Sequence, residues 1–320
     1  MAKQHVTSAR QMPLFEVPAK EAEITREAKL QVVTPLFQRH LFHEGRTENT
    51  VNAFTADLHL LGEHIGAGTR IGDINTSLLQ EFMDWLETGR GVPCSRKSYA
   101  RRVTTLKVFF KWLTELGVLE HDPAVAILQR SGPAPLATIL DEGDIINVLA
   151  YCSSLRLNEK SDPRPEFLFR LLLETGIKKN ETMRLRRDDF DETDPKNPMM
   201  RVRQESATNA LKERILRVPP GLITLMDAYL RVYTTKTGIL FPCTPRNLEY
   251  VLADIAEKSD LPHKISFEMM RWTSAVRDYM NGTDPEAIRE KLGLSRISWT
   301  ETFQKIRRLS GEETESDEAD

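Results

Sequence analysis

A run of positively charged side chains that can neutralise phosphates lies between Thr88 and Trp112. The segment contains no acidic residue, so it lacks the acidic partners that usually accompany lysine and arginine on a helix face. Its basic residues are Arg90, Arg96, Lys97, Arg101, Arg102, Lys107 and Lys111. A cationic helix face binds nucleic acid by releasing counterions from the phosphates. We therefore expect these residues to contact DNA rather than to form an ordinary solvated face.

Two blocks in the C-terminal half contain a second set of candidate residues. The first block runs from Thr175 to Asp191 and reads TGIKKNETMRLRRDDFD. The second runs from Ser266 to Phe303 and includes Glu268, Arg271 and the tripeptide Leu292-Gly293-Leu294. Single short motifs are weak signals, but several motifs in order at matching spacings are specific.

Together these blocks resemble motifs of the tyrosine recombinases, the phage-integrase family. The first is similar to the family's Thr-Gly-Leu-Arg, two residues, Glu and then Leu-Arg-Trp-x-Asp-Ile-Asp. The second is similar to its His-x-x-Arg, Leu-Gly-His and tyrosine, at family spacing. The resemblance covers about residues 34 to 309. It implies a SAM-like helical core-binding domain, with Arg96 to Leu113 on the DNA-facing helix, followed by the family's catalytic-fold domain.

In that family, a tyrosine hydroxyl attacks a DNA phosphate and forms a covalent link. Two arginines bind the non-bridging oxygens, and a lysine and histidines handle protons or charge. Here the degenerate family positions are Lys178 for the first arginine, Glu268 and Leu294 for the histidines, Arg271 for the retained arginine, and Phe303 for the tyrosine. The strand lysine falls near Asn209, or on Lys212 if the hairpin shifts.

These departures predict a site without catalytic residues, because phenylalanine has no oxygen to attack with. A carboxylate at Glu268 would cost on the order of 4 kcal/mol if it lay about 4 Å from a phosphate. A salt bridge from Glu268 to Lys178 or Arg271 would reduce that cost. Lys178, Lys179 and Arg271 remain candidate DNA-binding residues.

Three functional hypotheses follow. The first is a DNA-binding pseudo-recombinase, not an enzyme, that clamps duplex DNA without cleaving it. It would act as an architectural or regulatory factor or as the non-cutting partner of an active recombinase. Its expected partners are double-stranded DNA and either further copies of itself on DNA or an active recombinase. The second is an active site-specific recombinase with another nucleophile, such as Ser298, Thr300 or Thr302. The third is a protein-interaction module that kept the fold.

Charge is unevenly distributed along the 320 residues. The whole chain has a net charge of −3, but Gly311 to Asp320 alone contribute −6, so the rest of the chain carries +3. A net charge averaged over an acidic tail is a poor guide to partners. If this tail folds over the basic surface, deleting it should raise DNA affinity.

The sequence gives no sign of a metal, a cofactor or a membrane. Cys94, Cys152 and Cys243 are widely separated, and the histidines have no metal-ligand spacing. No long apolar run or signal peptide is present, so we expect a cytoplasmic, nucleoid-associated protein. Gln11 to Phe15 resembles the peptide with which bacterial proteins dock on the replication sliding clamp.

Helices that position these residues are expected throughout, with a small sheet, in an α+β fold. We expect helix caps at Asn49 or Thr50, at Asn75 or Thr76, and at Ser95, and a last helix that begins at Ser298. Strands are expected from Met199 to Arg203 and from Arg214 to Val218. The predicted domains are a flexible arm (1–30), the helical core-binding domain (31–130), a linker (131–137), the recombinase-like domain (138–309) and an acidic disordered tail (310–320).

Overall fold

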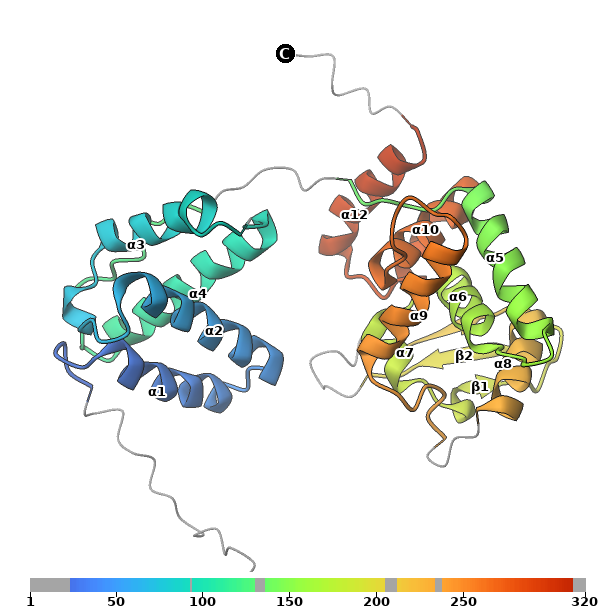
Figure 1. Ribbon diagram of the computed structural model, residues 1–320, viewed down its shortest axis with the longest axis horizontal. Helices are drawn as coiled ribbons and strands as arrows, with labels where there is room; N and C mark the ends of the chain where they lie inside the picture. The colour runs from blue at the N-terminus through green and yellow to red at the C-terminus, as the bar shows by residue number, and fades with distance from the viewer. Residues whose placement is uncertain (1–23, 93, 130–135, 205–211, 234–237, 313–320) are drawn as a thin grey trace, which may run out of the picture. The chain divides into compact units, whose positions relative to one another are not determined.

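The computed structural model describes residues 24–92, 94–129, 136–204, 212–233 and 238–312. The chain forms two compact units, Met1–Ala134 and Pro135–Asp320 (Figure 1). Both units are mainly helical and the second contains a small sheet, which confirms the predicted fold class. The Gln11 to Phe15 segment, most of the predicted linker and the tail beyond Glu312 lie outside the described residues.

The first unit is a bundle of helices around an aromatic core. Its helices are α1 (Leu30–His43), α2 (Glu48–Ile65), α3 (Thr76–Asp84), which continues into a π-helical turn (Trp85–Gly89), and α4 (Arg96–Glu115). Apolar residues at helical spacing give each helix one buried stripe. The rings buried where these stripes meet include Phe37, Phe82, Phe109 and Phe110.

Side-chain caps determine where these helices begin. The Ser95 hydroxyl accepts the Ser98 N–H at 3.2 Å, and the Asn75 side chain accepts the Leu78 N–H at 3.0 Å, so both predicted caps are confirmed. The predicted cap of α2 is wrong. Thr47 caps this helix, two residues before Asn49, because its hydroxyl accepts the N–H of Thr50.

A buried carboxylate on α2 holds the basic helix α4 in place. The side chain of Asp57 is only 4% exposed. It accepts hydrogen bonds from Arg101 Nη2 at 2.7 Å, Arg101 Nε at 3.0 Å and Thr105 Oγ1 at 3.0 Å. Arg102 Nε lies 3.5 Å from the same carboxylate. Two cations and one hydroxyl therefore share Asp57, which compensates for removing its charge from water.

The second unit packs its helices around α6. Its elements are α5 (Glu142–Leu157), α6 (Arg164–Thr175), α7 (Lys179–Arg184), β1 (Phe190–Asp191), β2 (Met199–Val202), β3 (Arg214–Arg217), α8 (Pro220–Val232), α9 (Pro245–Lys258), α10 (Phe267–Met280), α11 (Pro285–Lys291) and α12 (Arg296–Leu309). Helix α6 contacts α5, α8, α9 and α10. It is buried on nearly every side, which explains its run of apolar residues from Phe167 to Leu173.

The sheet is antiparallel with the strand order β1-β2-β3. Met200 pairs with Phe190 on one side and with Leu216 on the other, and all three side chains are buried. Strands β2 and β3 match the predicted strands to within one residue, whereas β1, only two residues long, was not predicted.

The C-terminal helices form a separate small hydrophobic cluster. Residues from α10, α11 and α12 meet there, and Ile306 is the α12 side chain that is fully buried among the described residues. Helix α12 begins at Arg296 with Ser295 as its cap, so the predicted start at Ser298 is wrong.

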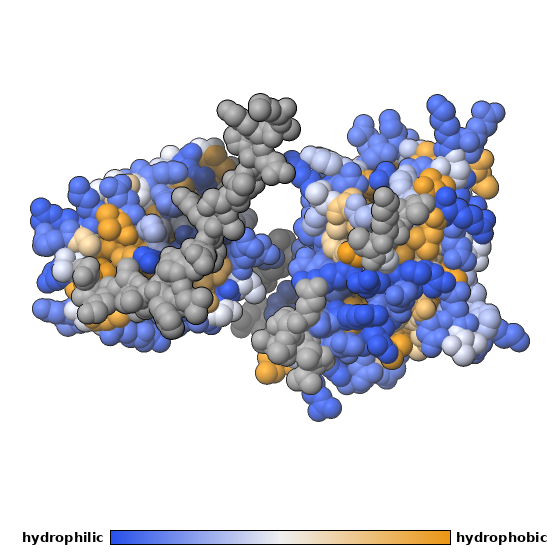
Figure 2. Space-filling model, turned by 90° about the horizontal axis from the view of Figure 1, so that it is seen from below, coloured by the Kyte–Doolittle hydropathy of each residue, from blue (hydrophilic) through white to orange (hydrophobic). Residues whose placement is uncertain are grey.

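The face of each unit seen in Figure 2 is mostly hydrophilic, with hydrophobic side chains in separate patches. Among the described helices, none has both the length and the hydrophobicity needed to cross a bilayer.

The Asp57 cluster makes the first unit sensitive to a single substitution. In Asp57→Ala, Arg102 becomes a buried cation without a carboxylate, which should cost about 3–5 kcal/mol. The exposed pair between Lys111 and Glu115, 3.5 Å apart, provides the control. Glu115→Ala should cost less than about 1 kcal/mol. Hydrogen exchange of α2 and α4 amides in a urea series measures both effects; equal losses would contradict the role of Asp57.

Candidate nucleic-acid interface

The predicted basic residues of the first unit fall into different environments. Arg96, Lys97, Arg101 and Lys111 are exposed, Arg90 and Lys107 are half-buried, and Arg102 is buried. Ser95 fixes the start of α4, so the exposed side chains of its first turns have defined positions. Most of the segment therefore does present positive charge to solvent.

Arg102 is not on the surface, although it was predicted to contact DNA. Its side chain is 10% exposed, and its Nη1 donates to Cys94 Sγ at 2.8 Å while its Nε faces Asp57. The head group is occupied inside the unit, which argues against a phosphate contact by Arg102. The expectation that the segment lacks acidic partners also needs correction, because Asp57 pairs with Arg101 and Glu115 pairs with Lys111.

Lys97 and Lys107 are lysines of α4 whose positive charge is not paired with a described carboxylate. Neither forms a salt bridge with a described residue, and each lies on the solvent side of the Phe109 stripe. Their ammonium groups can therefore approach a phosphate without first giving up a carboxylate.

In the second unit, the structure brings Lys178, Glu181, Arg214 and Arg271 together from different elements. Lys178 precedes α7, Glu181 lies within α7, Arg214 begins β3 and Arg271 lies in α10. The chain reaches this point through Gly176, which ends α6 with φ +58°. A Cβ at Gly176 would lie 3.2 Å from Leu292 and 3.3 Å from Ser274 Oγ, so glycine suits both the conformation and the space.

Glu181 is the carboxylate of this cluster. Arg214 donates to both of its oxygens, at 2.9 and 3.0 Å, and Gln204 Nε2 and the Lys178 N–H donate at 3.0 and 2.8 Å. Burial alone would raise the pKa of Glu181. The bonds and charge of Arg214, with help from Lys178, lower it to about 2. Glu181 is therefore ionised and its acceptor capacity is largely used.

Arg271 joins the ends of two helices to α10. Its Nη1 donates to the Gly176 carbonyl at 2.6 Å, and its Nη2 donates to the Leu292 carbonyl. Burial lowers the pKa of Arg271 to about 10; the Glu181 charge opposes this effect and the Arg214 charge adds to it. The guanidinium remains charged at neutral pH and retains N–H groups that these two carbonyls do not use.

Lys178 is an exposed residue whose ammonium group lies in a positive environment. Desolvation of the group lowers its pKa first, and the charges of Arg271, Lys212 and Arg214 lower it further. The Glu181 charge works in the opposite direction. Among the described residues, three positive charges and one carboxylate thus act on Lys178, and the local charge favours an anion.

The salt bridge suggested for Glu268 is not found among the described residues. Glu268 is exposed in the first turn of α10, and it forms no salt bridge with Lys178 or Arg271 among the described residues. It is also not among the charges that shift the pKa of Lys178.

The remaining predicted positions lie nearby or outside the described residues. Leu294 is half-buried against the C-terminal cluster, and its carbonyl accepts from Arg289 at 2.6 Å. Asn209 is outside the described residues. Lys212 is exposed and close enough to Lys178 for its charge to lower the pKa of Lys178. Lys179 is salt-bridged to Glu249 at 2.7 Å.

Phe303 is part of an aromatic stack on α12. Its ring centroid lies 5.2 Å from that of Trp299, with nearly parallel planes, and 5.6 Å from that of Tyr279, edge to face. The hydroxyls of Thr300 and Thr302 on the same helix donate to the carbonyls of Arg296 and Ser298. Position 303 thus contributes packing to the attachment of α12.

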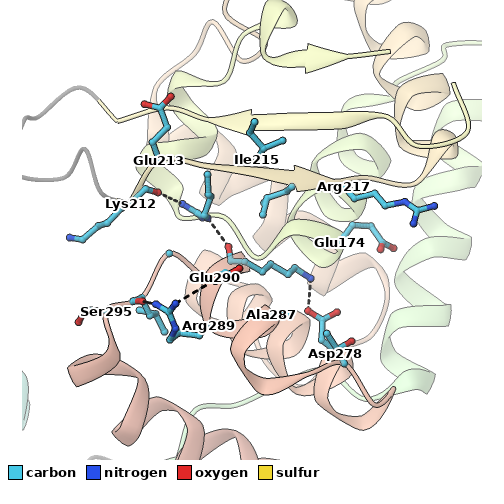
Figure 3. A pocket seen from close by; sticks show the side chains of 16 residues that line it. Glu174, Lys212, Glu213, Ile215, Arg217, Asp278, Ala287, Arg289, Glu290 and Ser295 are labelled. Atoms are coloured by element: carbon cyan, nitrogen blue, oxygen red, sulfur yellow. Dashed lines mark hydrogen bonds and ion pairs between the residues drawn. The ribbon is translucent and has the colours of Figure 1, made fainter. Parts of the chain in front are cut away.

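A pocket of about 980 Å³ borders the cationic cluster at Lys212 and Arg214, between β3 and α11 (Figure 3). Its walls carry both signs of charge, and several of the charges are paired with each other. Lys291 bonds Asp278 at 2.6 Å, and Arg289 lies 3.6 Å from Glu290. Within the described residues, no group of histidine, cysteine and carboxylate side chains has the geometry to hold a metal ion.

Comparison with known proteins finds similarity to phage integrases and tyrosine recombinases. Residues 35–117 match the family described as "Phage integrase, N-terminal SAM-like domain". The tyrosine recombinase XerC of Mycobacterium leprae is 26% identical over 288 residues, which is 84% of this chain and 93% of the relative. The tyrosine recombinase XerD of Listeria innocua is 24% identical over 282 residues, with 84% and 92% covered. The chain is therefore similar to tyrosine recombinases over most of its length.

Solved tyrosine recombinases share the fold. A lambda integrase dimer bound to a COC′ core site has a TM-score of 0.68 at 13% identity, covering 92% of this chain and 79% of that chain. The Tn1549 transposon integrase in complex with transposon right end DNA also has a TM-score of 0.68, at 15% identity, covering 89% and 99%. The predicted SAM-like domain and catalytic-fold domain are confirmed.

The prediction that this chain is not an enzyme is contradicted. The named relatives XerC and XerD, aligned over most of the chain, are enzymes. That prediction was drawn chiefly from Phe303 and its neighbours in the motif. The missing oxygen means that Phe303 itself cannot be the nucleophile. It does not decide whether the whole chain is active.

Arg214 was not predicted as a member of the cluster. Its partner Glu181 lies 33 residues earlier in the chain, so no local spacing points to the pair. Glu181 itself could have indicated the pair. It is a carboxylate within the Thr175 to Asp191 block, and a carboxylate that becomes buried needs a cation to compensate its charge.

The pKa of Glu181 makes a measurable contribution to stability. Because the folded-state pKa lies below the ordinary value, the ionised carboxylate stabilises the fold above about pH 5, and this stabilisation is lost as the pH falls toward 2. Glu181→Gln should be less stable than the wild type at pH 7. Between about pH 5 and about pH 2, its free energy of unfolding should fall by about 3 kcal/mol less than that of the wild type. Urea unfolding at several pH values measures the difference. Glu249→Gln, at an exposed pair, should follow the wild-type profile, and a Glu181→Gln profile parallel to the wild type would contradict the role of Glu181.

Proposed function

We propose that this tyrosine recombinase family member binds duplex DNA through its phosphates and acts in site-specific DNA recombination. The observation that carries the proposal is that Lys178, Lys212, Arg214 and Arg271 gather where the described residues supply one carboxylate, Glu181. A phosphate placed there meets net positive charge and guanidinium donors that match its oxygens.

The α4 surface supports the same proposal from the first unit. Exposed lysines such as Lys97 stand on a helix whose position is fixed by Ser95 and Asp57. A phosphate contact needs a cation on a rigid element rather than a specific base-reading geometry, so these residues fit positioning on the DNA backbone. Two observations support a role in recombination: relatives aligned over most of the chain are named tyrosine recombinases, and a structure of similar fold is described as the XerH site-specific recombinase bound to its difH substrate.

Binding through phosphates makes the affinity depend strongly on salt. Fluorescence anisotropy with a labelled duplex should show affinity falling steeply between about 50 and about 200 mM salt. In Lys97→Gln/Lys107→Gln, and separately in Lys178→Gln, each lost phosphate contact should reduce the salt slope by about 0.9.

Lys305→Gln is the matched control. Lys305 is a lysine of α12 that is hydrogen-bonded to Glu301 at 2.5 Å, and its replacement should leave the slope unchanged. The absence of duplex binding at low salt would overturn the proposed function.

We also propose that several copies assemble on one DNA molecule. The support is that related structures are described as a lambda integrase dimer bound to a core site and as a tetramer bound to a Holliday junction. Sedimentation of the protein with a duplex long enough for two copies should show a complex with at least two chains per DNA. A complex that holds one chain at saturating protein would contradict assembly.

A further inference from the structure

We propose that the outer edge of strand β3 is a docking site for an extended segment of a partner protein, which adds to the sheet as a fourth, antiparallel strand. The segment would lie in the pocket of about 980 Å³ between β3 and α11 (Figure 3). Docking at this edge requires neither DNA binding nor recombination, so it goes beyond the proposed function and does not rest on it.

Strand β3 is the last strand of the sheet, so one of its edges has no neighbouring strand. The order of the described strands is β1-β2-β3, and β2 is the strand that pairs with β3. The Val218 N–H donates to the Pro198 carbonyl at 3.0 Å, one position after the pair of Arg217 and Met199. In an antiparallel ladder, hydrogen-bonded and non-hydrogen-bonded pairs alternate. The N–H and C=O groups of Ile215 and Arg217 therefore point away from β2.

This unpaired edge faces the pocket. None of the four backbone groups of Ile215 and Arg217 has a hydrogen-bond partner among the described residues. Both residues line the pocket, and so do Ala287 and Lys291 of α11. Arg214 Nε donates to the Lys291 carbonyl at 2.7 Å, which fixes the start of β3 to the end of α11. A row of unpaired N–H and C=O groups beside an open space is a template for another strand.

Side chains at alternate positions of this edge determine the chemistry of the partner. Glu213, Ile215 and Arg217 are exposed, Ile215 by 57%, whereas Leu216 is buried. Glu213 and Arg217 form no salt bridge with a described residue, so pairing them with a partner breaks no ion pair there. Opposite charges and apolar pairs stabilise neighbouring strands when they lie directly across from each other. The partner segment should therefore carry an acidic residue opposite Arg217, an apolar residue opposite Ile215 and a basic residue opposite Glu213.

Two other occupants suit this edge less well. The chain's own tail from Gly311 to Asp320 contains no basic residue, so it has no cation to place opposite Glu213. A second copy would bring its own sheet and its own α11 against the α11 that borders the pocket. A single added strand needs only the space about 4.8 Å from β3. A separate extended segment that carries both charges meets both conditions.

Fluorescence anisotropy with the full chain and a labelled peptide tests the docking. The peptide contains Glu-Thr-Val-Thr-Lys, which in the antiparallel orientation places Glu opposite Arg217, Val opposite Ile215 and Lys opposite Glu213. It should bind saturably. Lys-Thr-Val-Thr-Glu has the same composition but places like charges opposite each other in this orientation, so it should bind about tenfold more weakly. Equal affinities would overturn the charge pairing, and no binding of either peptide would overturn the site.

N-methylated peptides distinguish strand addition from other modes of binding. In the added strand, the N–H of Val donates to the Ile215 carbonyl, and N-methylation at Val removes this donor. The affinity should fall at least about tenfold, since the Ile215 carbonyl again lacks a partner. N-methylation at the following Thr, whose N–H points away from β3, is the matched control and should leave most of the affinity intact. Equal losses would contradict strand addition.

Ile215→Pro changes the edge of the protein itself. Proline removes the N–H that points into the pocket and leaves the hydrogen bonds to β2, because an edge strand tolerates proline on its unpaired side. The variant should keep its thermal unfolding midpoint and lose peptide binding. Arg217→Glu provides a second variant with a rescue. It should bind Glu-Thr-Val-Thr-Lys about tenfold more weakly than the wild type and regain affinity for Lys-Thr-Val-Thr-Lys; failure of this rescue would overturn the pairing at Arg217.

Two further measurements separate a partner protein from the other occupants. If the chain without residues 313–320 binds the peptide at least about tenfold more tightly than the full chain, the tail occupies the edge. If Ile215→Pro changes the oligomeric state in sedimentation, a second copy occupies it. Either result would overturn docking of a partner, and an unchanged affinity and oligomeric state support it. Duplex binding is measured separately, so failure of the proposed function and failure of docking are distinguishable.

Discussion

The ion pair between Glu181 and Arg214 is the interaction on which the second unit's candidate site depends. Both side chains are less than a tenth exposed, so each has lost most of its hydration. Such a pair is tolerated only when its geometry is good and its remaining donors and acceptors are satisfied. The two-point contact meets the first condition. The bonds from Gln204 to Glu181 and from Arg214 Nε to the Lys291 carbonyl meet the second.

This pair also sets the electrostatics of the site. Arg214 touches α7 through Glu181 and the end of α11 through Lys291, and its head group would lie 2.9 Å from a Cβ at Gly293. The cluster therefore has little room to relax by moving its cations apart. The repulsion among Lys178, Arg214 and Arg271 is relieved in part by Glu181 and in part by a lower pKa at Lys178 and Arg271. An anion bound to the cluster would relieve the rest, and this links the stability of the site to its binding chemistry.

The helices and strands were predicted from the sequence more accurately than the tertiary contacts between them. Helix starts marked by one clear cap, such as Ser95 and Asn75, were predicted correctly because the capping bond is local. The start of α2 was wrong because Thr47, Asn49 and Thr50 are all chemically suitable caps, and packing rather than cap chemistry chooses among them. The charge of α4 was overestimated because Asp57, which neutralises part of it, lies more than forty residues away.

Anion binding and nucleophilic attack have different physical requirements, and the prediction from Phe303 treated them as one. Attack needs an oxygen at a single point. Anion binding needs only net positive charge, which Lys178, Lys212, Arg214 and Arg271 supply together. Phe303 fills a place between Trp299 and Tyr279, where an aromatic ring is required for packing whatever its para substituent. The identity of residue 303 therefore does not determine whether the cluster binds phosphate. The charge of the cluster depends on several residues and a buried ion pair. The cluster is therefore stronger evidence for the function of the chain than residue 303 alone.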